Sequence, residues 1–139
     1  MEYRRFDNTI MLRVDYGEEL VSSIEKVCRE ENVKLATVAG IGAFDSVEIG
    51  VYDVPTRNYE ILTFNQFFEL TSLLGNITTK DGDFYGHYHV TIGDEEGVVM
   101  GGHLKSGIIG GTGEIAITIL DGTIERQKCD ITGINVFKF

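Results

Sequence analysis

The chain has 139 residues and a mass of 15.5 kDa, the size of one ordinary domain, and we expect residues 1–139 to form a single one. Hydrophobic residues make up 42% and charged residues 24%, a globular composition that excludes disorder as the main state. No apolar run is long enough to cross a membrane and the first residues form no signal peptide, so we expect a cytoplasmic protein. The formal net charge of −10 opposes direct binding to the phosphates of nucleic acid.

The first predicted elements are a strand and an amphipathic helix. Residues 8–16 end in alternating apolar and polar side chains, a period of two that is typical of a strand. Gly17-Glu18-Glu19 then open a helix and place acidic side chains at the positive end of its dipole. Asn32 is expected to end it. The apolar stripe of this helix has i, i+3, i+4 spacing and consists of Leu20, Val21, Ile24, Val27 and Cys28.

Nine further strands are predicted after the helix, separated by turn signals rich in glycine, asparagine and aspartate. Asp121-Gly122 predicts a two-residue hairpin between the strands that flank it. Many short strands and one helix favour the α+β class, with one large, mainly antiparallel, curled β-sheet and a single main amphipathic helix packed on it. The predicted strands cover residues 34–43, 45–54, 58–66, 69–79, 84–93, 97–104, 113–121, 123–130 and 133–138.

The predicted sheet is too large for one helix to cover. An apolar part of it should therefore stay exposed, and patches of that kind usually mark subunit contacts. We expect a homo-oligomer with cyclic symmetry. The apolar residues expected in this patch are Phe64, Phe67, Phe68, Leu70, Leu73 and Leu74.

All three histidines of the chain fall within 17 residues, at His87, His89 and His103. His87 and His89 are two positions apart on a predicted strand, so their rings share one face of the sheet. We predict a hairpin whose three-residue loop places Gly93 opposite Gly97. In this register His103 lies directly opposite His87, and His89 is the diagonal neighbour on the same face. A loop one residue shorter or longer would turn His103 to the other face.

Three converging imidazoles can hold one metal ion, and the sequence predicts such a site at His87, His89 and His103. Three histidines around tetrahedral zinc leave the fourth position open for water or a small ligand. Nickel, copper and iron also accept imidazole, so the residues alone leave the metal open. The alternative is three separate histidines on a wet sheet face, and no carboxylate stands out as a general base. The residues expected to line the pocket beside the ligands are Gly86, Gly101 and Gly102.

Other motifs carry weaker signals. Gly111–Ala116 matches the letters of a dinucleotide fingerprint, but a predicted strand follows where a helix is required. Gly101–Gly113 is expected to be a loop, either merely flexible or bordering a pocket beside His103. Cys28 and Cys129 lie too far apart in the chain to form a metal or redox pair, and Cys28 is expected to be a small buried hydrophobe.

Several segments resemble, in order and spacing, the PPC ("plant and prokaryote conserved") domain, which occurs alone in bacteria and archaea and fused to AT-hooks in plant nuclear proteins. The resemblance implies an α+β domain that forms homotrimers, with a metal, usually zinc, on the histidines named above. The DNA-contacting AT-hook core is absent here, and Asn58 stands where the plant motif G-R-F-E-I-L has arginine. The segments that carry the resemblance are Ala39–Phe44, Tyr59–Leu62, Leu73–Ile77, His87–Val90, Gly101–Leu104 and Gly113-Glu114.

Three functions follow from these observations. The favoured one is a soluble homotrimeric metal-binding protein whose open three-histidine site serves ligand sensing or hydrolytic chemistry. The second is a DNA-associated regulatory protein, a label often given to stand-alone prokaryotic members, which the charge of −10 opposes. The third is a metal-free trimeric interaction module.

Overall fold

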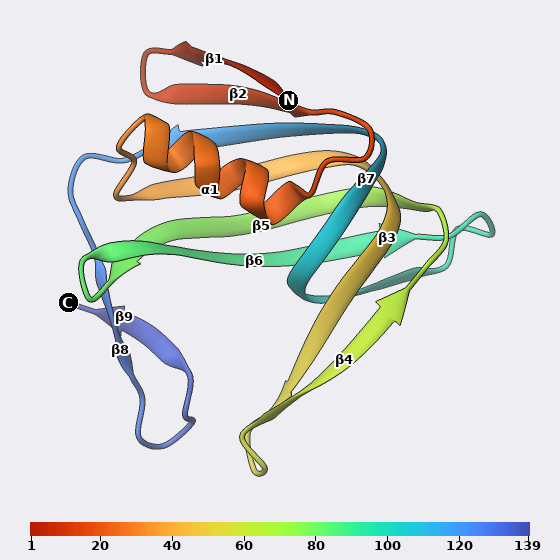
Figure 1. Ribbon diagram of the computed structural model, residues 1–139. Coiled ribbons are helices and arrows are strands. Elements are labelled where there is room, and N and C mark those ends of the chain that lie inside the picture. Colours follow the sequence, from red (N-terminus) through yellow and green to blue (C-terminus); the bar gives the residue numbers. More distant parts are fainter.

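The computed structural model describes residues 1–139 as one nine-stranded sheet and one helix, α1 (Leu20–Glu30) (Figure 1). The predicted class is confirmed: the sheet is curled and mainly antiparallel, and a single helix lies across one face of it. The strands are β1 (Glu2–Phe6), β2 (Thr9–Val14), β3 (Ala36–Asp53), β4 (Asn58–Phe64), β5 (Phe68–Lys80), β6 (Asp83–Gly93), β7 (Val99–Ile119), β8 (Glu125–Lys128) and β9 (Asn135–Lys138).

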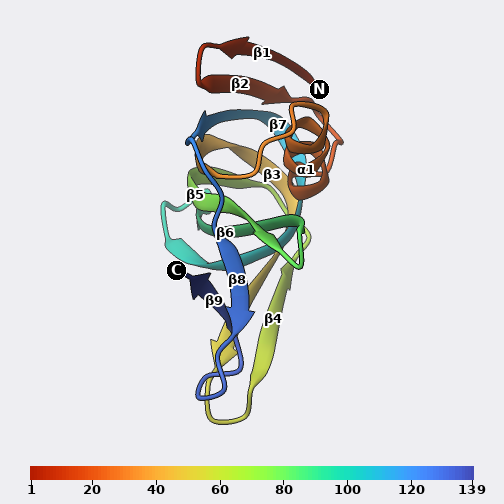
Figure 2. The ribbon, with the colours of Figure 1, turned by 90° about the vertical axis from the view of Figure 1, so that its left-hand side faces the viewer.

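The sheet closes on itself around four long strands. β3 pairs with both β5 and β7, and β6 pairs with the same two strands, so these four form a ring. The hairpin β1–β2 extends the sheet beyond β7, and β4 extends it beyond β3. β8 and β9 form a second hairpin, which joins β5 through the parallel pair Thr79–Glu125. In Figure 2 the β3–β4 and β8–β9 hairpins extend from the same end of this ring.

Two pairs of predicted strands are each one long bent strand. The predicted strands 34–43 and 45–54 are continuous in β3, and the glycine-rich segment Gly101–Gly113 lies inside β7 instead of forming a loop. The ladder between β3 and β7 shifts register at three places, between Gly42 and Ser46 and again after Glu48, and such irregularities let long strands bend. At Gly42 the backbone passes so close to the carbonyl of Thr112 that any side chain would collide with it.

The two ends of the chain differ from the prediction. The predicted strand 8–16 is β2, and β1 precedes it across a tight turn at Asp7, whose φ is 53°. The prediction of a two-residue hairpin at Asp121-Gly122 was wrong, because β7 ends at Ile119 and β8 pairs with β5 and β9 and not with β7. The turn signal was real but the chain crosses to another part of the sheet, which local sequence does not encode.

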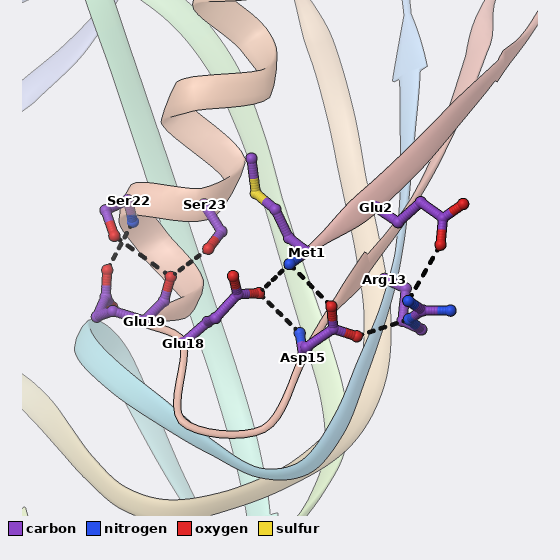
Figure 3. Close-up of polar contacts among 8 residues, drawn as sticks. All are labelled: Met1, Glu2, Arg13, Asp15, Glu18, Glu19, Ser22 and Ser23. Carbon is purple, nitrogen blue, oxygen red and sulfur yellow. Dashed lines mark hydrogen bonds and ion pairs between the residues drawn. The ribbon is translucent and has the colours of Figure 1, made fainter.

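Helix α1 is fixed by caps at both ends. Glu19 is the N-cap, and its carboxylate accepts a hydrogen bond from the backbone N–H of Ser22 (Figure 3). It also accepts from the backbone N–H of Val21 and of Gly107 on β7. The acidic residues therefore precede the first turn instead of lying in it. At the other end α1 stops at Glu30, two residues before Asn32, and Glu31 is the C-cap. Asn32 adopts a positive φ of 53°, and the N–H of Val33 donates to the carbonyl of Cys28, which closes the last turn.

An ion-pair cluster holds β1 and β2 beside the start of α1. The amino group of Met1 lies 2.9 Å from Asp15 and 2.6 Å from Glu18, and Arg13 bridges Asp15 and Glu2 (Figure 3). The Arg13 guanidinium and then the terminal amine lower the pKa of Asp15 to about 2.

The core lies between α1 and the concave side of the sheet and contains 24 buried residues, including Cys28 as predicted. Half of the apolar patch predicted to be exposed belongs to this core, because Phe68, Leu70 and Leu73 are buried. Phe68 and Leu70 alternate along β5, and a register shift between Leu70 and Ser72 then turns Leu73 inward. Phe67 and Leu74 are exposed, at 53% and 61%. Both cysteines are free, and the only helix is too short to cross a membrane.

Candidate metal centre

The β6–β7 hairpin places the histidines. Its connection is a five-residue turn, residues 94–98, in which the carboxylate of Asp94 accepts hydrogen bonds from the N–H groups of Glu96 and Val98. Gly93 therefore lies opposite Val99, and not opposite Gly97 as predicted. The turn is two residues longer than predicted, so the ladder shifts by two positions.

A shift of two positions preserves the face of every side chain, because the period of a strand is two. His103 consequently lies directly opposite His89, and His87 takes the diagonal position that was predicted for His89. On β6 the intervening residues Tyr88 and Val90 are buried in the core, so the histidines occupy the outer surface of the ring.

The three rings meet on this surface. The ring centroids are 5.2 Å apart between His87 and His89, 5.1 Å between His87 and His103, and 5.6 Å between His89 and His103. Each ring offers one nitrogen, and these three nitrogens all lie within 4.8 Å of one another. Imidazole ligands of one tetrahedral zinc ion, each at about 2.0–2.1 Å, are about 3.4 Å apart, so small side-chain rotations would fit the cluster to an ion.

The environment keeps two of the rings neutral, which is the form that binds metal. Burial, followed by the neighbouring His87, Lys105 and His89, lowers the pKa of His103 to about 4. Burial, followed by the charge of Arg126, lowers the pKa of His87. The Nδ1 atom of His103 is buried and has no hydrogen-bond partner, an unusual state that a bound cation at the ring would help to explain.

The three glycines expected beside the ligands have different neighbours. A side chain at Gly102 would collide with Ile49, and one at Gly101 would collide with the carbonyl of Val90, so both keep β7 close to its neighbours. These two glycines line a shallow hollow together with His89. The space at Gly86 is taken by the phenol of Tyr88, on the core side of β6.

A cleft of about 270 Å³ opens beside the cluster, and residues of the β3–β4 and β8–β9 hairpins line it. The Tyr52 hydroxyl closes one end by donating to the carbonyl of Thr132 at 2.8 Å, and Arg57 donates to the carbonyl of Asp130 at 2.7 Å. The side chains that line the cleft include Tyr52, Arg57, Tyr59, Tyr85, His87 and His103.

No carboxylate belongs to the histidine cluster or lines the cleft. Glu95 and Glu96 lie in the turn at the far end of the hairpin, and Glu69 and Glu114 line a separate hollow. Neither the sequence patterns nor the structure singles out any of them as a general base.

The tyrosines and Arg126 are the residues that sequence patterns did not reveal. Tyr59 packs on His103, with ring centroids 5.3 Å apart, and Lys105 Nζ lies 4.0 Å from the centre of the Tyr59 ring. Arg126 lies behind Tyr85, 4.7 Å from its ring centre. These residues come from β4, β6, β7 and β8, and no motif links them.

The chain is similar to several known proteins. The profile of the Plants and Prokaryotes Conserved (PCC) domain family matches residues 1–121. A metal-containing protein from Archaeoglobus fulgidus is 31% identical, with a TM-score of 0.88 and coverage of 99% of this chain and 97% of that one. A plant- and prokaryote-conserved (PPC) protein from Pyrococcus horikoshii is 33% identical, with a TM-score of 0.87 and coverage of 99% and 94%.

A candidate DNA-binding protein from Bacteroides thetaiotaomicron is 27% identical, with a TM-score of 0.96 and coverage of 99% of this chain and 96% of that one. No curated protein matches the chain.

Proposed function

Because the chain belongs to the Plants and Prokaryotes Conserved domain family, we propose that it is a homotrimeric metal-binding protein in which His87, His89 and His103 hold one zinc ion. The observation that carries the proposal is the convergence of three ring nitrogens within 4.8 Å on the outer surface of β6 and β7. The relative from Archaeoglobus fulgidus, described as metal-containing, supports it.

Three protein ligands leave zinc with an open position, the pattern of sites that bind a water or an exogenous ligand. Here the open side of the cluster adjoins the cleft, since His87 and His103 line it. Bound zinc acts as a Lewis acid toward whatever occupies that position. The protein's own contribution is to hold the three rings in place, keep His87 and His103 neutral and shape the space in front of them. Gly101 and Gly102 contribute by leaving the hollow beside His89 open.

Apolar side chains that remain exposed on the sheet support the trimer. Leu74 lies opposite His89 in the β5–β6 ladder and is 61% exposed, and Val99 on β7 is 60% exposed. Ile41 on β3 is 57% exposed. Exposed apolar groups of this size are a common mark of subunit contacts.

Metal analysis of protein purified without an affinity tag tests the proposal. We expect about one zinc per chain, and loss of that zinc in the His87→Ala and His103→Ala variants with the circular dichroism spectrum unchanged. The matched control is Lys26→Ala, on the exposed side of α1, which should retain the metal. A protein free of zinc, or His variants that retain it, would contradict the proposal and leave a metal-free interaction module.

The second candidate function is association with DNA, which rests on the similarity to the candidate DNA-binding protein from Bacteroides thetaiotaomicron. A net charge of −10 disfavours it, because cationic side chains supply most non-specific affinity for DNA. A gel-shift titration at low salt decides the matter. We expect no retarded band; a retarded band that disappears as salt is raised would favour this function.

A further inference from the structure

Arg126 is a buried cation without an anionic partner. Its side chain is held by neutral acceptors, with Nε donating to Thr78 Oγ1 at 2.8 Å, Nη1 to the Asn135 carbonyl at 2.9 Å and Nη2 to Asn76 Oδ1 at 2.6 Å. The residue is only 7% exposed. The guanidinium lies between the rings of Tyr85 and Phe137, each 4.7 Å away. Buried charges are ordinarily paired, so this one creates an uncompensated positive potential.

That potential is felt at the histidine cluster. Asn76, which accepts from Arg126, lies directly opposite His87 in the β5–β6 ladder, so the guanidinium is one side chain away from that ring on the same surface. Tyr85, on which Arg126 stacks, lines the cleft together with His87.

Two more cations surround the same cleft. Arg57 lines the cleft. Tyr59 lines it too, and the ammonium of Lys105 lies over the Tyr59 ring. No aspartate or glutamate lines the cleft, although the chain has 22 of these residues against 12 lysines and arginines. The cleft is therefore a local positive region on an acidic protein, and its walls focus the field of these charges onto its interior.

We propose that the cleft binds a small carboxylate ligand, with the carboxylate at the open side of the histidine cluster and its charge balanced by Arg126, Lys105 and Arg57. This inference rests on the proposed metal site and specifies its ligand class. The tyrosine rings provide apolar walls for the remainder of the ligand, which the cleft volume of about 270 Å³ limits to a small molecule.

The competing interpretation is a purely structural role, in which the hydrogen bonds of Arg126 only hold β8 against β5 and β9. It accounts for the three hydrogen bonds but not for the absence of a carboxylate partner or for the cations Arg57 and Lys105 at the same cleft. The two roles make different predictions for variants that remain folded: removal of the Arg126 charge weakens carboxylate binding only if Arg126 acts on the ligand.

The test uses the full-length protein loaded with Co²⁺, whose visible spectrum reports changes in coordination, titrated with acetate and with its neutral isostere acetamide. We expect acetate to bind the wild-type protein more tightly than acetamide. Arg126→Met should weaken acetate about tenfold and leave acetamide unchanged, and Arg126→Lys should retain most of the acetate affinity. Lys128→Met, which removes an exposed cation from the same strand, is the matched control and should bind acetate as the wild type does.

If Arg126→Met fails to fold, the double variant Arg57→Gln/Lys105→Met tests the same effect of positive charge on acetate affinity. It removes two cations and leaves the hydrogen bonds of Arg126 intact. Acetate affinity that is unchanged in the folded charge-removing variants, or acetamide that binds as well as acetate, would overturn the inference while leaving the metal site intact. Absence of Co²⁺ binding by the wild-type protein would instead refute the proposed function, and this inference with it.

Discussion

His89 lies directly opposite His103 across the β6–β7 ladder, and the turn that sets this pairing has five residues. The pairing brings one histidine from each strand together, and His87 completes the cluster from the diagonal position. A register shift by an even number of residues keeps every side chain on its face. The predicted grouping of the three histidines therefore holds, although the predicted turn was two residues too short.

The lowered pKa of His103 makes the stability of the metal-free protein depend on pH. The ring is neutral when folded down to about pH 4, whereas in the unfolded chain it takes up a proton near pH 6.5. The unfolded state therefore binds more protons between these values, so the free energy of unfolding should fall as the pH is lowered from 6.5 to 4. His103→Gln should reduce this slope.

Denaturant unfolding at several pH values, combined with NMR titration of the histidine ring protons, measures this effect. A His103 resonance that titrates near pH 6.5 in the folded, metal-free protein would contradict the prediction.

Glu19 should stabilise the fold through the N-terminus of α1. Its carboxylate accepts hydrogen bonds from Val21, Ser22 and Gly107, so Glu19→Ala leaves three N–H groups without that partner. We expect a loss of about 1–2 kcal/mol in the free energy of unfolding, and a smaller loss for Glu19→Gln, which keeps an acceptor. Urea unfolding measures it. Glu95→Ala, which removes the same charge from the exposed turn, should have no effect; an equal loss there would show that net charge, and not capping, is responsible.

Tyr88→Phe should stabilise the protein by about 1 kcal/mol. The Tyr88 hydroxyl is buried and has no hydrogen-bond partner, so removing it relieves the cost of its desolvation while the ring remains packed against Gly86. Tyr52→Phe makes the opposite comparison, since it loses the hydrogen bond to Thr132 and should destabilise by a similar amount. Thermal unfolding of the two variants checks both signs, and a lower melting temperature for Tyr88→Phe would show that the hydroxyl has a partner.

Leu74→Glu should dissociate the proposed trimer. The substitution places a charge on an exposed apolar position that lies beside His89, where a subunit contact would have to bury it. Light scattering after size-exclusion chromatography should give the mass of three chains for the wild type and of one chain for the variant. Ile131→Glu, at a position that is 85% exposed in the C-terminal turn, should remain trimeric. A wild-type protein with the mass of a single chain would contradict the trimer itself.

The sequence by itself determined which side chains share a face. Alternation along β6 separates His87 and His89 from the buried Tyr88, and the helical spacing of the apolar stripe identifies the side of α1 that is buried, because both periods are local properties of the backbone. The α+β class followed from the same periods. These local patterns could not show which elements far apart in the chain lie next to each other in the fold.

Only the tertiary structure decided which strands far apart in the chain pair and what surrounds the histidines. The continuity of β3 and β7 through their glycines, and the crossing of the chain from β7 to β8 instead of a hairpin at Asp121-Gly122, depend on contacts between residues far apart in the chain. The approach of Arg126 to the surface that carries His87 is of the same kind, since 39 positions separate them in the sequence. Such contacts are selected by the packing of the whole sheet, and no local period encodes them.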